Sequence, residues 1–222
     1  MKRAAFGMAL MLSTAALAAD TATERLTAAA NVFSEVMRTP DKGIPQDLLA
    51  KSQCVVIVPG MKKGAVVVGG QFGKGFAICR QEGMGWGAPG AVRVEGGSVG
   101  FQIGGSSTDV VMLVMNRSGM QKLLSDKFTL GADASVAAGP VGRTANADTD
   151  ARMTAEILAW SRAKGLFAGI SLSGATLRND LDANEELYGK KIDNKEALSG
   201  NVAPPPAAQA LRAALDKYSM RK

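Results

Sequence analysis

The sequence contains no histidine among its 222 residues, and this absence excludes several classes of chemistry. Catalytic triads and dyads that use histidine as the general base cannot form, and the commonest zinc ligand is missing. A serine nucleophile at Ser106 or Ser107 would need a lysine as its base, and no spacing in the chain indicates one. We therefore predict that the protein is not an enzyme and that it holds no cofactor.

A long apolar run is also missing at the N-terminus, where a membrane span would need about 20 apolar residues. Instead, Lys2 and Arg3 precede the shorter uncharged stretch 4–17, and the small residues Ala16 and Ala18 stand at its end, three and one positions before the expected cleavage site. A basic start, an apolar stretch and an A-x-A end are the order of a cleavable signal peptide. We predict a signal peptide over residues 1–18 and hence a protein of the periplasm or one that is secreted; a retained N-terminal anchor is the alternative.

Cysteine is scarce, with only Cys54 and Cys79 present. An even number of cysteines in an exported protein favours a disulfide, because the compartment is oxidising. Closing a loop of about 25 residues would contribute on the order of 3 kcal/mol. The alternative is a pair of buried free thiols.

The chain carries only a weak excess of positive charge. Without Lys2 and Arg3, 24 of the 26 basic residues remain against 20 acidic ones, a net charge of +4. Residues 54–130 hold eight of these basic residues and four acidic ones. Such an excess permits contact with anionic lipid and does not indicate a nucleic-acid partner.

The hydrophobic pattern changes from helical to strand-like near residue 53. Apolar residues recur at helical spacing over 20–38, and Pro45 opens a short second helix. Further helices are expected over 119–125 and 182–188, and a hairpin over 156–162 and 166–173. Val- and Ile-rich runs separated by glycine predict strands at 54–58, 65–69, 75–80, 86–94, 99–103, 109–115 and 132–138.

The C-terminal segment has a different composition. Residues 204–206 are three consecutive prolines, which indicate a stiff linker. We expect the helix that follows, over 207–218, to be part of a peripheral tail. The predicted organisation is a signal peptide at 1–18, one domain at 19–198, and a linker and tail at 199–222.

Glycine motifs of nucleotide-binding proteins are matched only superficially. The G-x-G-x-x-G pattern at 85–90 precedes a strand and contains a proline, so the helix N-terminus that binds pyrophosphate is missing. Residues 69–75 are one residue short of a P-loop. Four aspartates are candidate metal ligands: Asp109, Asp133, Asp148 and Asp150. No EF-hand spacing joins them, and isolated acidic residues in turns usually cap backbone groups. We therefore predict no metal site.

Five basic residues are the predicted contacts to lipid phosphates: Lys62, Lys63, Lys74, Arg93 and Arg143. Lys62 and Lys63 follow the turn residues at 59–60, so we expect both ammonium groups to be exposed. Arg143 follows a Gly-Pro turn and can supply a bidentate phosphate contact. For each single residue, the alternative is a solvated surface charge without a ligand.

Several longer motifs, in order, resemble the SYLF domain family of lipid-binding proteins. They cover most of residues 25–190 and are GAVVVGGQFGKG (64–75), WGAP (86–89), VGFQIG (99–104), TDVV (108–111), LGADASVAAGPVGR (130–143), KGLFAGISL (164–172) and NEELYG (184–189). The resemblance implies a β-rich domain with flanking helices and no catalysis. It also implies phospholipid binding, especially of phosphoinositides in eukaryotic members, some of which bind actin.

The chain departs from the eukaryotic pattern by its predicted signal peptide and by the lack of an SH3 or FYVE module in the sequence. We therefore expect an α+β fold, a compact antiparallel β barrel or sandwich with flanking helices. The expected function is non-catalytic binding of anionic phospholipid at the bacterial cell envelope. The alternative is a structural envelope protein that binds a protein partner or a cell-wall polymer.

Overall fold

The computed structural model describes residues 20–38, 43–65, 69–83, 85–98, 104–142 and 154–219. The predicted signal peptide at 1–18, the predicted strand at 99–103 and Arg143 lie outside these residues. None of the described helices is both long and apolar enough to cross a membrane.

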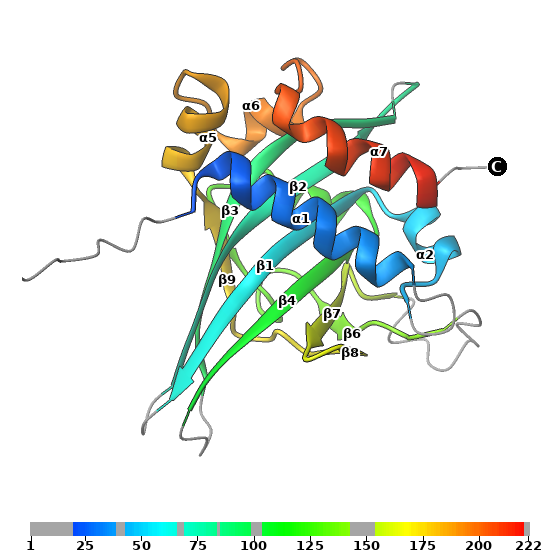
Figure 1. The fold of residues 1–222 in the computed structure, drawn as a ribbon, viewed down its shortest axis with the longest axis vertical. Coiled ribbons are helices and arrows are strands. Elements are labelled where there is room, and N and C mark those ends of the chain that lie inside the picture. Colours follow the sequence, from blue (N-terminus) through cyan, green and yellow to red (C-terminus); the bar gives the residue numbers. More distant parts are fainter. Residues whose placement is uncertain are drawn as a thin grey trace, which may run out of the picture.

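One curled sheet of nine strands forms the centre of the described structure, in the order β5-β9-β3-β2-β1-β4-β7-β6, with β8 paired to β7. All its strand pairs are antiparallel except β6 with β7. The sheet curls into a half-barrel with helices at its flanks, which confirms the expected α+β class (Figure 1). The strands are β1 (Cys54–Ala65), β2 (Gly69–Gln81), β3 (Gly85–Ser98), β4 (Gly104–Val114), β5 (Lys127–Thr129), β6 (Val136–Ala138), β7 (Ile157–Ala163), β8 (Leu166–Gly169) and β9 (Thr176–Asn179).

Helix α1 (Ala22–Met37) begins at a capping box, in which the Thr21 hydroxyl accepts from the Glu24 N–H and the Glu24 carboxylate accepts from the Thr21 N–H. Its apolar side, including Leu26 and Phe33, is buried against the sheet. This confirms the helix predicted over 20–38. The other helices are α2 (Gln46–Lys51), α3 (Arg117–Leu123), α5 (Leu181–Tyr188), α6 (Asn194–Leu198), a 3-10 turn (Pro206–Ala208) and α7 (Gln209–Tyr218).

The central strands separate two hydrophobic layers because successive residues of a strand point to opposite faces. Val55 and Ile57 pack beneath α1 on the helix side, whereas Val56 and Val58 belong to the layer on the opposite side. Cys54 and Cys79 are register partners in that second layer, and the structure joins them in a disulfide.

Strand β1 is longer than the sequence predicts. Pro59 and Gly60 were expected to end a strand at residue 58, yet pairing with β4 resumes at Met61 and continues to Ala65. Gly60 adopts a positive φ of 56°, and the pairing register with β4 shifts between Val58 and Met61. The two residues therefore form a bulge within one long strand, because a glycine can absorb the extra residue without a steric cost.

Helix α7 is not the peripheral tail that the sequence predicts. Its residues Leu211 and Leu215 are fully buried in the helix-side layer, and α7 lies beside α1 (Figure 1). The Trp86 indole N–H donates to the hydroxyl of Ser219 at 2.9 Å, just after the helix. The helix is integral because α1 and β3 offer it an apolar surface, which the local sequence does not reveal.

Candidate functional site

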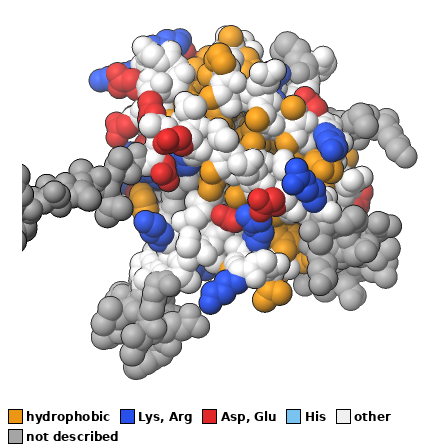
Figure 2. Space-filling view, in the orientation of Figure 1, with side chains coloured by type: hydrophobic (Ala, Val, Ile, Leu, Met, Phe, Trp, Pro, Cys, Tyr) orange, Lys and Arg blue, Asp and Glu red, His pale blue; other side chains and the backbone are white. Residues whose placement is uncertain are grey.

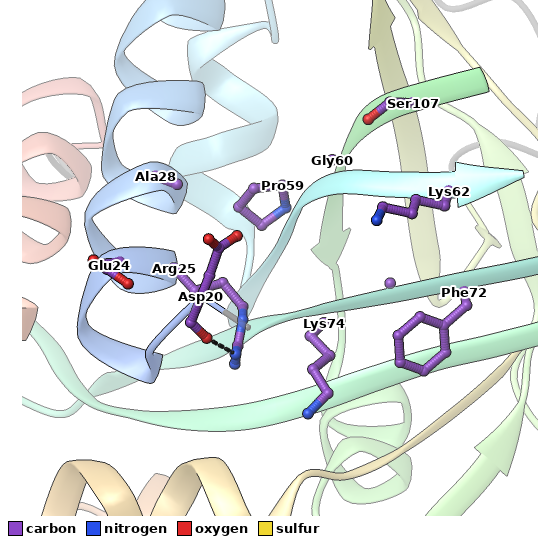
Figure 3. Close-up of a pocket in the computed structure, with 11 residues that line it drawn as sticks. Asp20, Glu24, Arg25, Ala28, Pro59, Gly60, Lys62, Phe72, Lys74 and Ser107 are labelled. Atoms are coloured by element: carbon purple, nitrogen blue, oxygen red, sulfur yellow. Dashed lines mark hydrogen bonds between the residues drawn. The ribbon is translucent and has the colours of Figure 1, made fainter. Parts of the chain in front are cut away.

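A hollow of about 520 Å³ lies between the first turns of α1 and the strands β1 and β2 (Figure 3). It is lined by Asp20, Glu24, Arg25 and Ala28 at the helix, Pro59, Gly60 and Lys62 on β1, Phe72, Gly73 and Lys74 on β2, and Ser107 on β4. Strands β1 to β4 extend beyond the helices as a twisted arm (Figure 1).

The bulge in β1 is held in place by a network of charged groups. The Gly60 N–H donates to Asp109 Oδ1 at 2.9 Å, and Arg162 Nη2 donates to Asp109 Oδ2 at 2.7 Å. Arg162 also forms an ion pair with Glu35 of α1. Burial alone would lower the pKa of Arg162, but the hydrogen bonds that it donates to Glu35 and Asp109, with the attraction of their charges, outweigh this effect, so its pKa is raised. The network ties α1 to the sheet beside the hollow.

Three cationic side chains surround the hollow. Arg25 donates from Nη2 to the carbonyl of Asp20 at 2.8 Å, while its buried Nη1 has no hydrogen-bond partner among the described residues. Lys62 is exposed and forms no ion pair with a described residue. Lys74 has 34% of its side chain exposed and lies 3.0 Å from Asp180. The Glu24 carboxylate is occupied by Thr21, and these hydrogen bonds lower its pKa.

An aromatic side chain lies in the same row of the sheet as Lys62. Phe72 is the register partner of Lys62 on β2, and Ser107 is its partner on β4. Phe72 is 45% exposed, which is unusual for a large apolar side chain in this protein. The hollow therefore combines cations with an apolar contact point.

The next row on the same face of the sheet, two residues closer to the tip of the arm, consists of glycine. Gly105, Gly64, Gly70 and Gly97 are register partners across β4, β1, β2 and β3. A Cβ added at Gly64, Gly70 or Gly97 would have no described atom within 4 Å. This row leaves bare backbone next to Phe72, and the surface beside the grey atoms at the lower left of Figure 2 is mostly white.

The structure brings together two of the predicted phosphate contacts, Lys62 and Lys74. Lys63 follows Lys62 in the strand and therefore points to the opposite face. Arg93 is the register partner of Lys74 but pairs with Asp180 at 3.3 Å and does not line the hollow. No observation on the described residues tests lipid contact by any of these side chains.

Sequence inspection missed Arg25 and Phe72. Arg25 falls within the helix predicted over 20–38, and Phe72 falls within the glycine-rich motif at 64–75. No local signal identifies either residue as part of a site, because α1 and β2 meet only in the folded chain.

A second hollow, of about 460 Å³, includes Arg80 and Arg117. The guanidinium of Arg80 already donates to the carbonyl groups of Leu49, Ser52 and Ser219. It also stacks over Trp86, 4.3 Å from the ring centroid. Arg80 therefore has a structural role, and the second hollow is the weaker candidate.

Comparison with known proteins identifies relatives of this chain. Residues 95–218 match the Ysc84 family, described as "Las17-binding protein actin regulator". An SH3 domain-containing protein of Schizosaccharomyces pombe is 39% identical over 171 residues, which are 76% of this chain and 40% of that protein. LAS seventeen-binding protein 3 of Saccharomyces cerevisiae is 35% identical over 175 residues, 77% of this chain and 38% of that protein.

A vertebrate relative, SH3 domain-containing YSC84-like protein 1 of Xenopus laevis, is 33% identical over 182 residues, 81% of this chain and 54% of that protein. The chain thus spans about half or less of the length of these relatives, of which two are named for an SH3 domain and one as a binding protein. The family match runs from β3 to the end of α7 and covers more than half of the 222 residues. The resemblance to the SYLF family is confirmed, and the chain belongs to the Ysc84 (SYLF) family.

Proposed function

We propose that the protein binds anionic phospholipid, without catalysis, at the bacterial cell envelope. The observation that carries this proposal is the convergence of Arg25, Lys62 and Lys74 on one hollow beside the exposed ring of Phe72. A guanidinium and two ammonium groups are suited to phosphate oxygens. An aromatic ring next to them is suited to the boundary between headgroups and acyl chains.

The energetics are those of weak, reversible binding. Each basic residue near an anionic surface contributes about 1 kcal/mol, and salt screens this attraction. The glycine row beyond Phe72 adds a surface without side chains, because strand glycines allow another molecule to approach the backbone closely. We assign the phosphate to the cations and the apolar part of the lipid to Phe72 and the glycine row.

The location at the envelope rests on the predicted signal peptide over residues 1–18. The Cys54–Cys79 disulfide supports an oxidising compartment such as the periplasm, because structural disulfides are rare in the cytosol.

A protein partner is the second candidate function. Relatives carry names such as LAS seventeen-binding protein 3, and the family is described as an actin regulator. Leu166, the first residue of β8, is 77% exposed and offers an apolar contact outside the hollow. An envelope protein or a cell-wall polymer could use this surface in a structural role.

Co-sedimentation with vesicles of phosphatidylcholine, with and without phosphatidylglycerol, tests the proposal at low and high salt. Lys62→Glu reverses a charge at the hollow and should weaken binding to anionic vesicles by roughly 30-fold, or about 2 kcal/mol for two units of charge. The matched control is Lys63→Glu, which makes the same change on the opposite face of the same strand and should have a much smaller effect.

Two results would contradict the proposal. If wild-type protein sediments equally little with both kinds of vesicle, the lipid function fails and the protein partner becomes the leading candidate. If Lys62→Glu and Lys63→Glu weaken binding equally, net charge rather than the hollow governs the contact.

A further inference from the structure

Asp180 lies between the end of β9 and the start of α5, and its carboxylate has an unusual environment. The side chain is completely buried, and neither Oδ1 nor Oδ2 has a hydrogen-bond partner among the described residues. Asp180 is the N-cap residue of α5, where an aspartate usually accepts a backbone N–H of the first turn, worth about 1 kcal/mol. Here the side chain makes no such bond. Its orientation is therefore set by something other than the helix.

Two cations from the sheet hold the Asp180 carboxylate. Lys74 Nζ lies 3.0 Å from Oδ2, and Arg93 Nη2 lies 3.3 Å from Oδ1. Lys74 and Arg93 are register partners on β2 and β3, and like charges at such positions repel each other. Asp180 relieves that repulsion from a position where water does not reach it.

Lys74 is shared between this buried carboxylate and the hollow. It lines the hollow and is partly exposed, whereas Asp180 and Arg93 do not line it. An anion that enters the hollow therefore meets one ammonium group without an ion pair to a described residue, on Lys62, and one that is already paired with Asp180, on Lys74. We propose that Asp180 is an internal counter-ion that competes with the phosphate of the ligand for Lys74.

This inference rests on the proposed phosphate-binding function and makes it more specific. Asp180 lowers the affinity of the site for phosphate. Only a phosphate that displaces the Asp180 carboxylate from its ion pair with Lys74 is attracted by the full charge of both Lys62 and Lys74. Asp180 therefore sets the affinity of the site through Lys74, without contacting the ligand itself.

Removal of the charge should strengthen binding. Asp180→Asn keeps the shape of the side chain and leaves Lys74 free for the ligand, so affinity for phosphatidylglycerol vesicles should rise about fivefold, the equivalent of about 1 kcal/mol for one charge. Asp182→Asn is the matched control, because it removes the same charge two residues away, from a side chain that is 91% exposed and pairs at 3.8 Å with Arg93 rather than with Lys74. We expect the control to change affinity less than twofold. An equal gain in both variants, or no gain in Asp180→Asn, overturns the counter-ion role.

A second comparison begins with variants of partly or fully exposed residues, and its first part does not depend on the folding of the Asp180 variant. With Asp180 present, Lys74→Gln should weaken vesicle binding clearly less than Lys62→Gln, because Lys74 is already paired with Asp180. In the Asp180→Asn background, the two losses should become similar. If Lys74→Gln and Lys62→Gln weaken vesicle binding equally with Asp180 present, the inference is overturned. It is also overturned if Asp180→Asn lowers the affinity, because Asp180 would then position Lys74 for binding rather than compete for it.

Wild-type controls separate this inference from the function on which it rests. If wild-type protein shows no preference for anionic vesicles, the proposed lipid function fails. If it shows that preference but Asp180→Asn binds no more tightly, only the counter-ion role fails.

A parallel titration with soluble glycerol phosphate identifies the source of the phosphate. The same ranking of variants with the soluble compound supports the role of Asp180 and identifies a soluble phosphate, rather than the membrane, as the ligand.

Discussion

At the scale of single residues, glycines of one strand serve different purposes. Gly75 lies where β2 approaches β1, and a Cβ there would collide with the carbonyl group of Ile57 and come within 2.7 Å of the Val58 Cα. Gly70, in the same strand, has no described atom within 4 Å of an added Cβ. Packing therefore requires glycine at 75 and does not require it at 70.

This difference predicts opposite effects on stability. Gly75→Ala should lower the free energy of unfolding by more than about 2 kcal/mol, because backbone atoms of β1 cannot move aside cheaply. Gly70→Ala should leave it unchanged or raise it by about 0.5 kcal/mol, because alanine loses less backbone entropy than glycine on folding. Urea unfolding of the two variants measures both free energies. If Gly70→Ala lowers the free energy of unfolding, other atoms must lie close to Gly70, which would contradict the open space around it.

At the scale of elements, α1 and α7 depend on each other. Phe33 of α1 and Tyr218 of α7 make an edge-to-face contact with ring centroids 6.2 Å apart. Leu211 and Leu215 of α7 are buried in the hydrophobic layer on the helix side of the sheet. The Arg212 Nε donates to the carbonyl of Trp86 at 2.7 Å. These contacts make the last helix part of the structure that holds α1 over the sheet.

Truncation of one buried side chain tests this role of α7. Leu215→Ala should lower the free energy of unfolding by about 2–4 kcal/mol, the usual cost of a cavity in a core. Gln209→Ala, at an exposed position of the same helix, is the control and should change stability by less than about 0.5 kcal/mol. Similar values for both variants would return α7 to the status of a peripheral tail.

At the scale of the whole molecule, the stability of the half-barrel depends on its central strands, because they contribute side chains to the hydrophobic layers on both faces of the sheet. The disulfide joins β1 to β2 in the middle of the strand order, with both cysteines completely buried. In the chain-entropy account, such a bond stabilises the fold by restricting the unfolded chain.

Reduction provides the corresponding prediction. A reductant should lower the free energy of unfolding of the wild type by about 3 kcal/mol, the value expected for a loop of about this length. The double variant Cys54→Ala with Cys79→Ala should be insensitive to reductant, which controls for effects unrelated to the bond. If wild-type stability is the same with and without reductant, the cysteines are free thiols in solution.

Much of the fold could be predicted from patterns within short segments. The capped, amphipathic stretch around Leu26 and Phe33 predicts α1, and β-branched runs predict the central strands. The hairpin of β7 and β8 follows from two apolar runs around a Lys-Gly turn, where Lys164 and Gly165 both have a positive φ. The burial of α7 could not be predicted in this way, because it depends on an apolar surface built by α1 and β3.

The sequence by itself determined the class of fold, the family, the pair of cysteines and a surplus of basic residues in the middle of the chain. Tertiary structure decided which of those basic residues share a hollow. The bulge at Gly60 inserts one extra residue into β1, and because side chains alternate with a period of two, this reverses the face of every residue that follows. Lys62 therefore points to the hollow and Lys63 away from it, although the two are neighbours of the same type. Arg25 and Lys74 meet at that hollow only because α1 packs across the curled sheet.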